Sequence, residues 1–273
     1  MKRQYLNDFF QQHWGKSDPF GEITKFEGET FRDVKNRHTM RFEIDGRGFF
    51  IKIHRGVGWK EILKNIFQFK LPILGAANEY DALNLLHKLN VPTMTAAAFA
   101  IRGKNPAKLE SFLITEELTN VESLEDYAKR FRTVKIDFRR KLGIIRQLAR
   151  SSRLMQENGI NHRDYYICHF LMDLKSQDVD NPTLYMIDLH RAGLRNKVPY
   201  RYKVKDIGGL FFSAMDENVT RRDFYRFIKY YSGKSLKQTL TGNKQFWSDV
   251  KANGIKLYKK DFGKNPPEMI MNL

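Results

Sequence analysis

The sequence has a single cysteine, Cys168, and no long run of apolar residues. One thiol excludes a disulfide within the chain and a zinc site built from several thiolates, so folding does not require an oxidising compartment. The longest weakly polar stretch, residues 93–101, is about half of the ~20 residues that a membrane-spanning helix needs. The N-terminus also lacks the apolar segment of a signal peptide. We therefore expect a cytoplasmic protein whose contact with a membrane is peripheral.

Acidic residues are few relative to basic ones, with 31 Asp and Glu against 48 Lys and Arg, a net charge of +17. Such an excess attracts polyanions, which include nucleic acid, an anionic membrane leaflet, a phosphorylated ligand and an acidic protein. The basic residues are spread along the chain without an interleaved aromatic platform, so we do not expect nucleic acid as a partner. With 273 residues, 41% of them hydrophobic, the chain suits one large domain or two closely packed lobes.

Strand patterns come first and helix patterns follow. Residues 30–34, 39–44 and 49–54 are short, partly alternating runs, and Asp45-Gly46 between the last two is a hairpin signal. Residues 78–89 and 137–157 have helical spacing, as does the chain from about residue 206. This order predicts an α+β fold with two lobes facing each other across a ligand-binding cleft. The expected lobes are a strand-rich N-terminal lobe, residues 1–118, and a helical C-terminal lobe, residues 119–273.

Two aspartates have the spacing that phosphoryl transfer requires. Asp164 lies on a loop after the predicted helix 137–157, and Asp188 ends an apolar strand, residues 184–187, some two dozen residues later. In phosphoryl transfer, one carboxylate orients the attacking hydroxyl and accepts its proton, while another holds Mg²⁺ against the phosphates. The pattern therefore predicts Asp164 as the catalytic base and Asp188 as the metal ligand.

His162-Arg163-Asp164 and the later Asp188 resemble the catalytic loop and the metal-binding aspartate of the protein-kinase-like superfamily. That resemblance implies a two-lobed kinase-like fold, with an antiparallel sheet and a helix in the N-terminal lobe and mainly helices in the C-terminal lobe. It also implies ATP and Mg²⁺ as cofactors.

The same resemblance assigns the nucleotide-binding residues. Lys52, in the middle of the strand 49–54, matches the lysine that binds the α- and β-phosphates, and Glu79 on the following helix would pair with its ammonium. Thr115-Glu116-Glu117-Leu118 falls where the adenine-binding segment is expected, with contacts from the backbone of Glu116 and Leu118.

Two positions depart from the superfamily pattern. The residue five positions beyond the base is His169 instead of asparagine, and imidazole is a poor ligand for Mg²⁺, which prefers oxygen. His169 would bind the metal together with a water, position Asp164 or a phosphate by hydrogen bonding, or fill space. A glycine-rich loop is also missing, and Lys35-Asn36-Arg37 stands between the first two strands. These residues would hold phosphates through cationic side chains, or they form a basic hairpin tip.

Longer strings resemble the lipopolysaccharide core heptose(I) kinases of Gram-negative bacteria, from about residue 15 to residue 231. They are residues 50–56, 70–76, 114–118, 123–126, 161–171 and 187–192. One departure is Tyr165, where that family's pattern suggests a second cysteine.

The resemblance implies transfer of the ATP γ-phosphate to the 4-hydroxyl of the first heptose in the inner core. The acceptor would be a glycolipid at the cytoplasmic face of the inner membrane, and acylated acyl carrier protein would be an acidic partner. Two alternatives stay open, namely a kinase of another small sugar or aminoglycoside-like acceptor, and a non-catalytic scaffold that binds lipid or acyl carrier protein. His190, Arg191 and Arg195 would bind acceptor phosphate or form a solvated loop.

Overall fold

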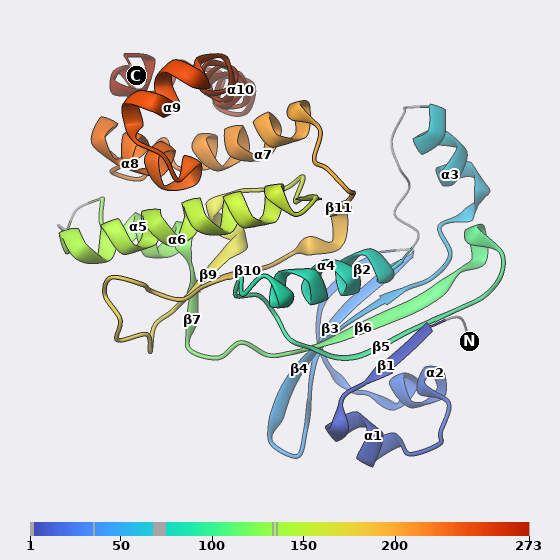
Figure 1. Ribbon diagram of the computed structural model, residues 1–273. Helices are drawn as coiled ribbons and strands as arrows, with labels where there is room; N and C mark the ends of the chain where they lie inside the picture. The colour runs from blue at the N-terminus through green and yellow to red at the C-terminus, as the bar shows by residue number, and fades with distance from the viewer. Residues whose placement is uncertain (1–2, 35, 68–74, 133, 135, 273) are drawn as a thin grey trace. The chain divides into compact units, whose positions relative to one another are not determined.

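The computed structural model describes residues 3–34, 36–67, 75–132, 134 and 136–272 of the chain (Figure 1). Contacts divide the chain into two units. The first comprises Met1–Leu85 and Met94–Thr119, and the second comprises Leu86–Thr93 and Asn120–Leu273. The first unit is built on a sheet and the second is largely helical, as the predicted α+β class requires.

A six-stranded antiparallel sheet forms the first unit, in the order β1-β5-β6-β4-β3-β2. Its strands are β1 (Arg3–Leu6), β2 (Gly28–Val34), β3 (Arg37–Ile44), β4 (Arg47–His54), β5 (Ala96–Arg102) and β6 (Glu110–Glu116). The helices that begin in this unit are α1 (Asp8–Trp14), α2 (Pro19–Glu22), α3 (Gly58–Phe67) and α4 (Ala77–Lys88). The sequence did not predict β1, β5 or the first three helices.

The predicted hairpin is confirmed between β3 and β4. Asp45 and Gly46 have φ values of 50° and 72°, the left-handed pair that a two-residue turn needs to match the twist of the strands. The turn fixes the register, in which Lys52 of β4 lies opposite Thr39 of β3. Lys52 therefore occupies a set position in the middle of the sheet.

The alternation along β4 separates a core face from a polar one. Phe49 and Ile51 are fully buried in an aromatic cluster that includes Phe10 and Trp14 of α1. Because successive side chains of a strand point to opposite faces, Lys52 lies on the face turned away from this cluster. Its partner Glu79 comes from α4.

The second unit is organised around α6 (Phe138–Glu157), which confirms the helix predicted over residues 137–157. The Asp137 side chain caps its start by accepting a hydrogen bond from the Arg140 N–H. The other helices are α5 (Leu124–Arg130), α7 (Tyr200–Ser213), α8 (Arg221–Ser232), α9 (Leu236–Gly242), α10 (Lys244–Phe262) and α11 (Glu268–Met271). Among the helices of the described ranges, none combines the length and the apolar character needed to cross a bilayer.

Two small antiparallel sheets complete the second unit, with strand orders β10-β9-β7 and β11-β8. Their strands are β7 (Val121–Ser123), β8 (Ile160–Asn161), β9 (Phe170–Asp173), β10 (Leu184–Met186) and β11 (Gly193–Leu194). Both sheets flank the loop that follows α6, so they fix the polypeptide on either side of residues 162–169.

Gly159, directly after the end of α6, should not tolerate a side chain. Its φ is 81°, and an added Cβ would lie 1.7 Å from the carbonyl oxygen of Arg195. We predict that Gly159→Ala lowers the free energy of unfolding by about 2 kcal/mol or more, because the strained backbone and the clash act together. Chemical denaturation measures this change. Gly242→Ala, a helical glycine with open space around it, is the control and should leave stability unchanged or slightly increased.

Candidate functional site

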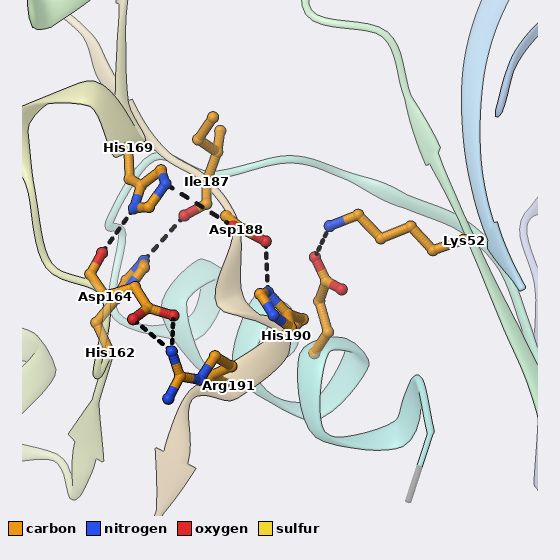
Figure 2. Close-up of polar contacts among 9 residues, drawn as sticks. Lys52, His162, Asp164, His169, Ile187, Asp188, His190 and Arg191 are labelled. Atoms are coloured by element: carbon orange, nitrogen blue, oxygen red, sulfur yellow. Dashed lines mark hydrogen bonds and ion pairs between the residues drawn. The ribbon is translucent and has the colours of Figure 1, made fainter. Parts of the chain in front are cut away.

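Pairing between β9 and β10 brings together the two segments that carry the predicted catalytic and metal aspartates. Met186 lies opposite Phe170 in this pair, and the next amide, Ile187 N–H, donates to the carbonyl oxygen of His169 at 3.0 Å. Figure 2 shows Asp164, His169 and Asp188 gathered in one network of polar contacts. These residues all belong to the second unit.

Asp188 lies in a turn at the end of β10. Its backbone is left-handed, with φ 60° and ψ 48°, a conformation that aspartate tolerates better than most residues. One carboxylate oxygen contacts Nδ1 of His190 at 2.5 Å, and the other lies 3.8 Å from Nε2 of His169. The side chain is 31% exposed, so the carboxylate remains accessible to a ligand.

Asp164 is held by a cation from the segment that follows Asp188. Nη1 of Arg191 donates to both carboxylate oxygens of Asp164, at 2.7 and 2.9 Å (Figure 2). This charge-assisted contact holds the carboxylate in one orientation. Arg191 therefore links the two acidic residues through a single short segment, residues 188–191.

His169 occupies the position where the superfamily has asparagine. Its Nδ1–H donates to the backbone carbonyl of Asp164 at 2.6 Å, which leaves Nε2 turned toward Asp188. A hydrogen bond with the Cys168 side chain raises the pKa of His169 to about 9, with further contributions from the Asp164 carbonyl and the Asp188 charge. Of the roles that the sequence left open, hydrogen bonding to the Asp164 segment is the one with a contact of normal length.

Behind the loop lies a buried anchor that sequence reasoning missed. The Asp206 carboxylate of α7, 2% exposed, accepts hydrogen bonds from the N–H groups of His162 at 2.8 Å and Arg163 at 3.0 Å. Burial raises the pKa of Asp206 to about 7, although both hydrogen bonds act in the opposite direction. The available signal was an acidic residue directly before the apolar run of α7, which begins at Ile207, because an unpaired carboxylate buried there is costly.

His162 is fully buried beside this anchor. Its Nε2–H donates to the carbonyl oxygen of Ile187 at 2.9 Å, so it connects the loop to the end of β10 (Figure 2). Burial lowers the pKa of His162 to about 4, which keeps the ring neutral at physiological pH. The role of His162 is thus structural support of the two aspartate-bearing segments.

The first unit holds the predicted lysine–glutamate pair. Nζ of Lys52 lies 2.6 Å from Oε1 of Glu79, and their side chains are 16% and 1% exposed. A carboxylate this deeply buried needs its partner, since an unpaired charge there would cost several kcal/mol. The pair therefore fixes the position of the ammonium (Figure 2).

The predicted adenine-binding segment, residues 115–118, begins in the last two residues of β6 and continues beyond the strand. The Glu116 N–H already donates to the Thr95 carbonyl at 2.9 Å, and its carboxylate pairs with Arg47 at 3.0 Å. Leu118 is half-buried. The amide of Glu116 is therefore used within the protein, and its carbonyl oxygen and the Leu118 peptide are the backbone groups that would meet adenine.

Parts of two sequence predictions lie outside the described residues. They are Lys35 of the proposed phosphate-binding turn, and residues 70–74 of the string 70–76. Next to the first gap, the Asn36 carbonyl accepts a hydrogen bond from the Arg55 N–H, which ties this turn to the end of β4.

No group of three or more His, Cys, Asp or Glu side chains placed to hold a metal ion occurs among the residues that the structure describes. Mg²⁺ is usually bound through one or two carboxylates together with waters and substrate phosphates. The exposed carboxylate of Asp188 fits that donor set, whereas His169 supplies a nitrogen and fits it poorly.

Comparisons with known proteins agree on one family. The model of the lipopolysaccharide kinase (Kdo/WaaP) family matches residues 22–231. The chain is 40% identical to lipopolysaccharide core heptose(I) kinase WaaP of Pseudomonas aeruginosa, over 94% of this chain and 97% of that protein. It is 42% identical to the same kinase of Escherichia coli K12, over 89% and 93%. A solved structure described as WaaP in complex with acyl carrier protein superposes with a TM-score of 0.81 at 36% identity, covering 94% of this chain and 99% of that one.

The Asp206 anchor generates a stability prediction. Asp206→Ala removes the acceptor of two buried N–H groups, and each unsatisfied group costs about 1–3 kcal/mol. We therefore expect the free energy of unfolding to fall by about 2–6 kcal/mol, measured by chemical denaturation. A variant as stable as the wild type would show that the anchor is dispensable.

Asp206→Asn is the matched control, because it keeps one acceptor oxygen and should lose less stability. It also isolates the titration of the carboxyl, whose pKa is 3.8 unfolded and about 7 folded. Folding favours the protonated form, so this contribution is complete below pH 4 and is lost as the pH rises toward 7. The stability of the wild type relative to the Asn variant should decrease over that range.

Proposed function

Because the chain belongs to the lipopolysaccharide kinase (Kdo/WaaP) family, we propose that it transfers the γ-phosphate of ATP to the 4-hydroxyl of the first heptose of the lipopolysaccharide inner core. The relatives named as heptose(I) kinases match nearly their whole length. The observation that carries the proposal is the contact network in which His169 contacts both the Asp164 carbonyl and the Asp188 carboxylate, while Arg191 pairs with Asp164.

Asp164 is the proposed catalytic base. Its carboxylate, held by Arg191, orients the heptose hydroxyl and accepts the proton as the oxygen attacks the γ-phosphate. Each carboxylate oxygen that meets Arg191 has further lone-pair capacity, so the ion pair and the hydroxyl contact are compatible. His169 positions the base by holding the Asp164 carbonyl.

The remaining site residues bind the nucleotide in this proposal. Asp188 would hold Mg²⁺, which neutralises charge on the β- and γ-phosphates. Lys52, fixed by Glu79, binds the α- and β-phosphates, and backbone groups of Glu116 and Leu118 bind adenine. Since the sequence has no glycine-rich loop, cationic side chains next to the β2–β3 turn, such as Arg37 at the start of β3, take over part of the phosphate binding.

A glycolipid acceptor lies in a membrane, so it also determines where in the cell the enzyme acts. We propose that the enzyme works at the cytoplasmic face of the inner membrane through peripheral contact. The net charge of +17 supports this, because a polybasic surface is attracted to anionic lipid headgroups.

The test of the proposal is phosphate transfer from ATP to purified heptose-containing core, compared with other small sugars and an aminoglycoside. We expect transfer to the heptose acceptor alone, and a decrease in kcat of about 10²- to 10⁴-fold for Asp164→Ala without loss of stability. Asp261→Ala, an exposed aspartate of α10, is the control and should retain full activity.

Near-normal turnover of Asp164→Ala would exclude Asp164 as the base. Faster transfer to another acceptor would overturn the substrate assignment. Binding of ATP without transfer to any acceptor would favour the non-catalytic scaffold.

We propose acylated acyl carrier protein as a partner of the second unit. An apolar cavity of about 410 Å³ lies among α6, α7, α8 and α10, and this volume is within the range of ligand pockets. Its lining includes Leu148, Ile207, Leu210, Phe211, Phe224 and Trp247. An acyl chain fits such a lining, because each buried CH₂ contributes about 0.8 kcal/mol.

A cationic groove lies on α6, α8 and the loop after α8, and shares α6 and α8 with the cavity. It is lined by Arg146, Arg150, Arg153, Lys229 and Lys234. Its lining contains no acidic residue, and within the described part of the chain none of these five cations has a carboxylate at ion-pair distance. Uncompensated positive charge favours an acidic protein surface. The solved relative, WaaP in complex with acyl carrier protein, supports the choice of partner.

A charge reversal in the groove tests this partnership. We expect Arg150→Glu to weaken binding of acylated carrier protein about tenfold or more, since it places like charges together. Arg222→Glu, which makes the same charge change on an exposed arginine outside the groove, is the control. Calorimetry measures both, with unacylated carrier as the second comparison. Equal affinity for acylated and unacylated carrier would show that the cavity does not bind the acyl chain.

A further inference from the structure

Helix α3 carries three large apolar side chains that remain in solvent. Trp59, Leu63 and Phe67 are 54%, 48% and 80% exposed. They recur every four residues, and at about 100° per residue this spacing keeps all three within roughly 80° of the helix circumference. They form one continuous stripe, which we call the α3 stripe. Surface apolar side chains are usually scattered singly, whereas a contiguous patch marks an interaction site.

The helix is anchored to the first unit by a different side. Ile62 is 5% exposed, and α3 packs against the turn Pro106–Lys108 between β5 and β6 (Figure 1). The backbone there approaches closely, since a Cβ added to Gly56 would lie 2.3 Å from the Ala107 carbonyl oxygen. Ile62 and the contact with Pro106–Lys108 therefore hold the helix in place, while the α3 stripe keeps about half or more of its surface exposed.

Two lysines border the stripe. Lys60 and Lys64 follow Trp59 and Leu63 directly in the helix, and both are exposed. A helix with Trp, Leu and Phe on one face and lysines beside it is typical of segments that lie in the plane of a membrane interface. The tryptophan suits the headgroup level, and the lysines suit anionic lipid phosphates.

We propose that α3 docks the enzyme on an anionic bilayer, with the α3 stripe inserted at the boundary between headgroups and acyl chains. Lys60 and Lys64 contact lipid phosphates in this arrangement. The inference rests on the proposed function, because a glycolipid acceptor requires the enzyme to work at a membrane. It goes further by assigning the contact to one helix of the first unit, separate from the residues that bind nucleotide and acceptor.

Co-sedimentation of the full-length protein with vesicles tests the inference. The vesicles contain phosphatidylethanolamine with phosphatidylglycerol, or phosphatidylcholine alone as the neutral comparison. We expect wild-type protein to bind the anionic vesicles more tightly, and the double variant Leu63→Gln/Phe67→Gln to lose about tenfold or more of that binding. Leu174→Gln is the matched control, because Leu174 is 49% exposed but lies outside α3. It should bind as the wild type does.

Transfer of phosphate to a water-soluble, delipidated heptose core is measured on the same samples. The double variant should retain wild-type kcat there, since the α3 stripe takes no part in the chemistry. Equal vesicle binding by the wild type and the double variant overturns the inference and leaves the proposed function standing. The inference is also overturned if the wild type does not bind vesicles but forms a dimer that the double variant does not form. The α3 stripe would then contact a second copy of the chain. Stripe-dependent vesicle binding without phosphate transfer supports the inference while the proposed function fails.

Discussion

The buried carboxylate of Asp206 is the interaction on which the second unit's polar network depends. By accepting both the His162 and Arg163 amides, it fixes the loop that carries Asp164. The His162 side chain donates a hydrogen bond to the Ile187 carbonyl. Arg191, in the segment after β10, pairs with the Asp164 carboxylate. The geometry of the two aspartates thus follows from a helix residue that touches neither of them.

Local signals predicted the elements that depend on neighbouring residues. The Asp45-Gly46 turn and the helix over residues 137–157 were identified correctly, because turn conformation and capping are decided within a few positions. The Lys52–Glu79 contact was also anticipated, though only through family resemblance. Strand β5 was missed because its alanine-rich sequence, Ala96–Arg102, has neither alternation nor many β-branched residues.

Contacts between distant residues were beyond sequence reasoning. Asp206 lies more than forty positions from the amides it holds, and Arg191 lies 27 positions from Asp164. No periodicity encodes such pairs, since they arise from how α6, α7 and the small sheets pack. For the same reason, the sequence left several roles open for His169. The hydrogen bond to the Asp164 carbonyl favours the role in which His169 positions Asp164.

Asp188 combines an unfavourable backbone conformation with the side chain that we propose as the metal ligand. Its left-handed conformation costs an ordinary L-residue roughly 1–2 kcal/mol, and glycine would adopt it without that cost. If thermal stability alone were selected, glycine would therefore be favoured over aspartate at position 188. A redesign that optimises folding energy alone would gain heat tolerance here and remove the carboxylate that we assign to the metal, so such a procedure should keep position 188 constant.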